Sequence, residues 1–253
     1  MATRWRFPLG AALAVLAAPV LGASAFAASP QPQTGTITAA EYAEPTTRYD
    51  HGILGDAVEW GALVMTLSDG SRHLIRLPET RVFEDTSPRL ADLDGDGAPE
   101  VIVVETDTSL GAQLAVYDAG GKVTATPHIG RSNRWLAPIG AADLDGDGKT
   151  EIAYVDRPHL AKTVVILRYD DRKLTRVAQR DGFTNHRIGD KVIAGGIRQC
   201  NSETPEMIVA DGGWRELYAL QFDGQRITDR PLGPLRAGGD FDAALTCPDK
   251  TPQ

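Results

Sequence analysis

Four pairs of short apolar segments recur along the chain, and each pair is joined by a polar turn that contains Gly or Asp. β-forming residues on both sides of such a turn are typical of β-hairpins. The turns are centred near Gly70, Gly120, Asp171 and Gly224, so they repeat every 50 to 53 residues. The predicted hairpins are Leu63–Leu67 with His73–Leu77, Leu114–Tyr117 with Val123–Thr126, Val164–Tyr169 with Leu174–Val177, and Leu217–Phe222 with Arg226–Thr228.

Two further extended segments precede each hairpin. The nearer ones are His51–Leu54, Val101–Glu105, Ile152–Asp156 and Met207–Asp211. The earlier ones are Thr36–Tyr42, Arg89–Leu93, Ala137–Leu144 and Val192–Ile197. Four short strands per unit at this period, without helical periodicity, predict the blades of a β-propeller. We therefore expect an all-β fold, a small β-propeller of about four four-stranded blades.

The ends of the chain leave the closure of this propeller open. A five-bladed ring that reuses both ends is one alternative, and an open arc is another. Leu235–Leu245 could be a strand that closes the ring, or a loop.

Two stretches between predicted strands share the acidic sequence D-L-D-G-D-G-x-x-E. Carboxylates this dense in a glycine-bearing turn repel one another, and a hard divalent cation with oxygen ligands, most simply Ca²⁺, removes that repulsion. We expect two structural Ca²⁺ ions that tie these turns and cross-link blades. The predicted ligands are Asp92, Asp94, Asp96, the Ala98 carbonyl and Glu100 in the first loop, and Asp143, Asp145, Asp147, the Lys149 carbonyl and Glu151 in the second.

This acidic loop, followed directly by an apolar strand, resembles the FG-GAP, or VCBS, repeat. That repeat builds the propeller of integrin alpha subunits and of many secreted bacterial proteins. Trp135–Gly140, ahead of the second loop, is similar to the opening of the repeat. The resemblance covers two units well, the fourth weakly and the first by spacing alone. It implies a blade whose metal loop joins the first and second strands, and it identifies no ligand.

The corresponding loop of the fourth unit has lost its acidic ligands. Its first, third and fifth positions are Arg198, Cys200 and Ser202, and only Glu206 remains, so we expect no metal there. Arg198 is expected to pair with Glu206 in place of the cation. Cys200 and Cys247 are an even count in a chain that looks exported, which predicts one disulfide.

The N-terminus predicts export. Arg4 and Arg6 precede an apolar stretch at Leu9–Leu21, and Ala25-Phe26-Ala27 fits a cleavage site, so we expect a signal peptide at 1–27 and one propeller domain at 28–253. No later segment has the length of a membrane span. The domain has a net charge of −10, which argues against nucleic acid as a partner. We expect a periplasmic or secreted protein.

The turns on the face opposite the metal loops are rich in Arg, His and Trp. Such planar side chains recur at binding hot spots. The candidates for a ligand face are Arg134, Trp135, Arg157, His159, His186, Arg187 and Trp214. The alternative is that the tryptophans pack between blades and the arginines are solvated or paired with nearby acids.

The leading hypothesis for function is therefore a calcium-stabilised binding or scaffold module whose partner is an unknown protein, glycan or small anionic ligand. One alternative is a hydrolase or lyase that acts on an anionic saccharide or small anion around Arg134, Arg157, His159 and His186. Catalysis has the weaker support, because the common catalytic motifs are absent. The other alternative is a carbohydrate-binding lectin.

Overall fold

The computed structural model describes residues 1–2, 35–200, 204–236 and 239–247. Over these residues the fold is all-β, with 17 strands in three antiparallel sheets and one short helix. Residues 3–27 of the predicted signal peptide, and the boundary between 27 and 28, lie outside the described residues. No helix in the described ranges is long and apolar enough to cross a membrane.

The first sheet has eight strands in two lobes. One lobe is β1–β3, and the other is β4–β8; a single residue pair, Trp60 with Phe83, joins them. In the second lobe, β4 and β5 both pair with the same edge of β6. The strands are β1 (Ile37–Thr46), β2 (Glu59–Leu67), β3 (Arg72–Arg76), β4 (Arg81–Phe83), β5 (Arg89–Ala91), β6 (Glu100–Asp107), β7 (Gly111–Asp118) and β8 (Gly121–Ala125).

The other two sheets repeat the pattern of the second lobe. The second sheet runs in the order β12-β11-β10-β9, and in the third β13 and β14 share one edge of β15, followed by β16 and β17. The strands are β9 (Leu136–Ala142), β10 (Glu151–Asp156), β11 (Thr163–Asp170) and β12 (Lys173–Asp181) in the second sheet. Those of the third are β13 (Phe183–Thr184), β14 (Gly196–Arg198), β15 (Glu206–Asp211), β16 (Glu216–Phe222) and β17 (Ile227–Pro234).

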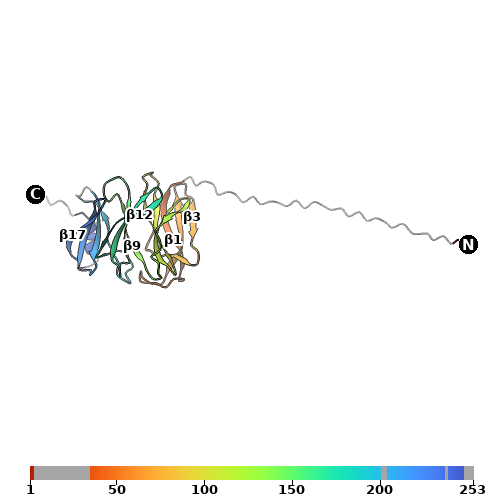
Figure 1. Cartoon of the computed structure of the whole chain (residues 1–253), viewed down its shortest axis with the longest axis horizontal. Coiled ribbons are helices and arrows are strands. Elements are labelled where there is room, and N and C mark those ends of the chain that lie inside the picture. The colour runs from red at the N-terminus through yellow and green to blue at the C-terminus, as the bar shows by residue number, and fades with distance from the viewer. Residues whose placement is uncertain (3–34, 201–203, 237–238, 248–253) are drawn as a thin grey trace. The chain divides into compact units, whose positions relative to one another are not determined.

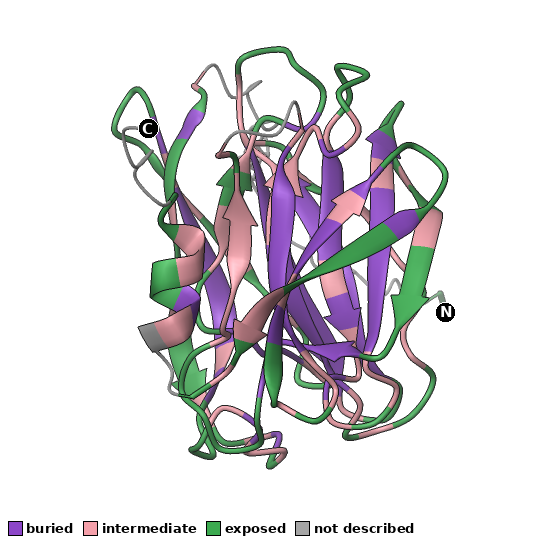
Figure 2. Ribbon diagram, turned by 90° about the vertical axis from the view of Figure 1, so that its left-hand side faces the viewer, coloured by how far each residue is buried: buried purple, intermediate pink, exposed green. Residues whose placement is uncertain are grey.

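The sheets stack face to face because their central strands are apolar on both sides. In β6, Val101 and Val103 pack toward the β1–β3 lobe, whereas Ile102 and Val104 pack toward β10 and β11. The same alternation in β10 and β15 builds a core between the second and third sheets. The buried central strands are visible in Figure 2. Figure 1 shows β3 and β1 at one end of this row and β17 at the other.

The C-terminal segment is neither of the two forms that the sequence left open. Helix α1 (Gly239–Leu245) lies within Leu235–Leu245 and packs on the face of β15 and β16 that points away from the second sheet. Phe241 is buried there against Ile208 and Ala219. The helix therefore covers the face on which a further sheet would stack.

The prediction of a strand at His51–Leu54 is wrong. β1 pairs directly with β2 over most of its length, and 47–58 is a loop. Gly52 and Gly55 have φ of 60° and 89°, which breaks an extended conformation. Ile53 is buried in the core between the first and second sheets, so the apolar residues of this segment serve tertiary packing.

Candidate metal centre

The first acidic loop connects β5 to β6, between the first two strands of its unit. Gly95 and Gly97 have φ of 77° and 86°, and no atom stands within 4 Å of where their side chains would begin. The carboxylate of Asp92 accepts hydrogen bonds from the N–H groups of both glycines, at 2.8 and 3.0 Å. The loop is thus folded around the first of its predicted ligands.

Three carboxylates of this loop converge. Asp92, Asp94 and Asp96 each offer an oxygen that lies within 4.8 Å of the other two, and all three residues are exposed. Among the described residues, no lysine, arginine or histidine forms an ion pair with these acids or with Glu100. The donor set is all oxygen and, in the described residues, forms no ion pair, which fits a hard divalent cation.

Glu100, the first residue of β6, stabilises the backbone of the loop. It is buried, and its Oε2 accepts a hydrogen bond of 2.9 Å from the N–H of Leu93. Burial raises the pKa of Glu100, and the negative charge of Asp94 adds to the effect. Its carboxylate is not among the three oxygens that converge, although the sequence predicted it as a ligand.

The second loop, between β9 and β10, repeats this backbone. Asp143 accepts hydrogen bonds from Gly146 and Gly148 at 2.7 and 2.9 Å, and Glu151 Oε2 accepts one from Leu144 at 2.9 Å. Here the oxygens that lie within 4.8 Å of one another belong to Asp143, Asp145 and Glu151. The two copies of the motif therefore adopt the same turn conformation, but different carboxylates converge in each.

Arg168 on β11 accounts for the difference. Its guanidinium lies 2.6 Å from Asp145, 2.9 Å from Asp147 and 2.7 Å from Glu151. Burial lowers the pKa of Arg168, but the hydrogen bonds that it donates to Glu151 and Asp145 outweigh this and raise the pKa above its usual value. The sequence analysis missed this residue, because the contact depends on the register of β10 and β11, in which Arg168 is opposite Glu151.

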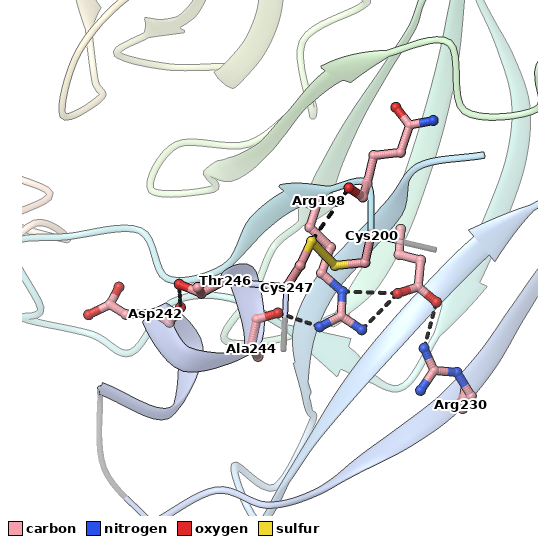
Figure 3. The surroundings of a disulfide bond; sticks show 9 residues. Arg198, Cys200, Arg230, Asp242, Ala244, Thr246 and Cys247 are labelled. Atoms are coloured by element: carbon pink, nitrogen blue, oxygen red, sulfur yellow. Dashed lines mark hydrogen bonds and ion pairs between the residues drawn. A yellow bond between two sulfur atoms is a disulfide. The ribbon is translucent and has the colours of Figure 1, made fainter. Parts of the chain in front are cut away.

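The predicted pair of Arg198 with Glu206 is present in the fourth unit. Arg198 donates two hydrogen bonds to Glu206 Oε2, at 2.9 and 2.7 Å, and Arg230 donates one to Oε1 at 2.6 Å (Figure 3). Burial would raise the pKa of Glu206, but the hydrogen bonds from Arg230 and Arg198 lower it overall. The acid is thus neutralised by two guanidinium groups.

The predicted disulfide is confirmed as well. Cys200 and Cys247 are bonded, with their Cα atoms 5.3 Å apart, and neither cysteine is free. Figure 3 shows the bond beside Arg198, whose guanidinium also donates to the carbonyl of Ala244 in α1. The disulfide and this arginine both tie α1 to the loop after β14.

Each acidic loop also contacts a neighbouring unit. Thr150 of the second loop donates a hydrogen bond of 3.2 Å to the carbonyl of Asp92 in the first. The turn at Gly224, between β16 and β17, lies against the side chain of Asp145. The acidic loops therefore lie at the junctions between successive units.

The candidate ligand face is brought together only in part. A cleft of about 30 Å³ is lined by Arg134, Trp135, Arg157 and His159, together with His51, Asn133 and Leu160. His186 joins them, because its Nδ1 lies 3.1 Å from His159 Nε2. Burial, and next the neighbouring His186, lower the pKa of His159 to about 4, so this imidazole is neutral at pH 7.

Arg187 and Trp214 lie apart from this cleft. The Arg187 guanidinium stacks over the Trp214 ring at 4.2 Å, and that ring packs against Phe241 of α1. Trp135 is buried and donates a hydrogen bond of 2.7 Å to the carbonyl of Glu84. Both tryptophans thus take part in packing, which was the alternative weighed from the sequence.

Sequence reasoning missed a buried pair beside the cleft. His51 Nδ1 lies 2.5 Å from the fully buried carboxylate of Glu84, which also accepts a hydrogen bond from Thr106 at 2.6 Å. His51 was assigned to a strand that does not exist, and Glu84 lies between two short strands with no motif around it. No local signal in the sequence marks the pair.

Comparison with known families supports the resemblance. Residues 84–154 match a family model described as an FG-GAP-like repeat. This stretch contains the whole first loop, the whole second loop and the start of β10. A comparison with curated proteins finds no match.

Proposed function

We propose, from the FG-GAP-like repeat at residues 84–154, that this chain is an exported calcium-binding module with a binding or scaffold role. The observation that carries the proposal is the convergence of Asp92, Asp94 and Asp96 in a glycine-bearing turn, where no described basic residue forms an ion pair with them. Oxygen ligands in such a turn suit Ca²⁺. The Cys200–Cys247 disulfide is compatible with an oxidising, extracytoplasmic compartment.

The repeats are proposed to form the blades of an open, propeller-like arc. In the last three units the acidic loop, or its degenerate copy, joins a strand to the central strand that pairs with it, and adjacent sheets share cores on their faces. The first unit contributes the three strands β1–β3. Helix α1 covers the outer face of the last sheet, which favours the arc over a closed ring.

The calcium is proposed to be structural. The first loop lies where two units meet, and an ion that binds only the folded chain stabilises it by mass action. Thermal unfolding in EDTA and in millimolar Ca²⁺ tests this role. We expect the midpoint to rise with calcium in the wild-type protein and not in Asp94→Asn.

The matched control is Asp69→Asn, because Asp69 is an exposed turn acid outside both loops whose carboxylate accepts a hydrogen bond from Ser71. This variant should keep the full response to calcium. Equal midpoints in EDTA and calcium for the wild-type chain would refute the structural role.

On the candidate ligand face, the partner is proposed to dock on the surface rather than to enter a pocket. The cleft around Trp135 and His159 has room for about one water molecule, far below the roughly 300 Å³ or more of typical small-molecule sites. For this reason we do not propose catalysis there. A glycan array read with and without calcium tests the lectin alternative, and a blank array in both conditions would argue against a lectin.

A further inference from the structure

Arg168 lies where a cation would bind in the second acidic loop. Its Nε, Nη1 and Nη2 atoms contact Glu151, Asp147 and Asp145 at 2.6 to 2.9 Å. The side chains of Glu151 and Asp145 are 0% and 5% exposed. A divalent cation would need the same oxygens, and a planar guanidinium already satisfies them with directional, charge-assisted hydrogen bonds.

The register of the strands explains why only this unit has an arginine on the strand opposite its buried glutamate. Arg168 is opposite Glu151 across β10 and β11. The pairing of Val101 with Tyr117, continued by one residue, puts Asp118 opposite Glu100 in the first loop's unit. Asp118 cannot act as a counter-charge for Glu100, and it is itself paired with Arg172 at 2.9 Å.

In the fourth unit the charge of the buried glutamate is compensated from other positions. Continuing the pairing of Met207 with Leu220 brings an amide, Gln221, opposite Glu206. Glu206 is instead paired with Arg198 and Arg230. Across three units, then, the buried glutamate has an arginine partner in two, and in the first it has none among the residues that the structure describes.

We propose that Arg168 is the built-in cation of the second acidic loop, so that the folded chain takes one divalent cation, at the first loop, in place of the two that the motif indicates. This rests on the proposed function for the first loop and makes a separate claim about the second. Arginine keeps its charge at any pH at which the protein is folded, so Arg168 is a permanent counter-charge. The second loop should stay ordered in chelator.

Isothermal titration with CaCl₂ of the full chain, first freed of metal, tests the claim. We expect one ion per wild-type chain, none for Asp94→Asn and one for Asp145→Asn. Two ions in the wild-type chain, with one lost in Asp145→Asn, would overturn the inference and leave the proposed function intact.

Removing the arginine is the converse test. Arg168→Gln should bind two ions, because the acids of the second loop then lack a partner. The control is Arg180→Gln. Arg180 lies near the end of β12 and forms an ion pair with Asp229, so this variant removes the same charge away from the acidic loop and should still bind one ion. An unchanged count in Arg168→Gln would contradict the inference.

The two proposals fail in different ways. If the wild-type chain binds no ion, the proposed function is wrong, and a single ion gained by Arg168→Gln would still support the claim for the second loop. No ion in either chain would overturn both.

If Arg168→Gln folds only in the presence of calcium, that requirement itself supports a new calcium site in the second loop. The comparison of Asp94→Asn with Asp145→Asn then still tests the ion count.

Discussion

Glu100, Glu151 and Glu206 occupy the same place in three units, and each is buried at the start of a central strand. Two of them have arginine partners, whereas Glu100 has only a backbone N–H among the described residues. A buried carboxylate without a counter-charge is costly. At the scale of single residues, this difference is proposed to distinguish the loop that binds a cation from the loop that does not.

Replacing Arg198 with Met should destabilise the fold. The variant leaves Glu206 with Arg230 alone, and loss of one hydrogen-bonded charge from a buried pair costs about 1–3 kcal/mol. Because its arginine partners lower the pKa of Glu206, the pair stabilises the protein above the unfolded pKa of about 4.3 and loses this effect as pH falls through the lower folded value.

Urea unfolding at pH 7 and pH 3 measures this effect. The difference in unfolding free energy between wild type and Arg198→Met should be large at pH 7 and smaller at pH 3. A difference that is the same at both pH values would mean that the pair does not act through charge.

Glu59 has the opposite titration. It is 2% exposed, and burial, together with the charges of Glu84, Asp56 and Asp85, raises its pKa to about 9. An acid with a raised folded pKa favours folding fully below its unfolded pKa and loses that contribution as pH rises toward the folded value. Stability should therefore decline between about pH 4.5 and 9.

Glu59→Gln, which keeps the neutral form at every pH, should remove this decline. The variant should match wild type near pH 4.5 and exceed it by a few kcal/mol at pH 8. Thermal unfolding across this range is the measurement. A variant less stable than wild type at pH 8 would show that Glu59 is charged and has a partner.

At the scale of elements, the strands that the sequence predicted best are those with two apolar faces and a tight turn. All four predicted hairpins are found near their predicted positions, because alternation and Gly or Asp turns are local signals. They are β2 with β3, β7 with β8, β11 with β12, and β16 with β17. The loop at 51–54 was predicted as a strand by spacing alone. Its apolar residue, Ile53, packs in a core made of distant segments.

Helix α1 and the residues that pair with the buried acids could not be predicted from the sequence for a related reason. A seven-residue helix in a Gly- and Asp-containing sequence has little intrinsic helical propensity, and packing of Phe241 stabilises it. The acidic loops could be predicted from their own spacing. Arg168 and the His51–Glu84 pair could not, because both depend on contacts between segments that are far apart in sequence.

The disulfide should be important for keeping α1 in place. It joins residues 47 apart, and bonds that close loops of this size contribute about 2–4 kcal/mol. The double variant Cys200→Ser with Cys247→Ser should lose about this much unfolding free energy in urea. Because α1 packs on the last sheet alone, proteolysis should then remove the C-terminal segment before the rest unfolds. Equal stability with and without the bond would contradict this.

At the scale of the whole folded unit, the acidic loops are joints between units rather than isolated surface turns. Thr150 reaches from the second loop to the backbone of the first, and the turn at Gly224 rests on Asp145. Neutralising these loops therefore affects contacts between sheets. The contact at the first loop is proposed to depend on calcium and the contact at the second loop on Arg168. Stability would then respond to calcium through a single site.

Anomalous scattering from a crystal grown in millimolar calcium tests the central claim most directly. We expect one strong peak among Asp92, Asp94 and Asp96, and the guanidinium of Arg168, without a peak, among Asp145, Asp147 and Glu151. An absent peak at the first loop, with its three carboxylates ordered, would contradict the account.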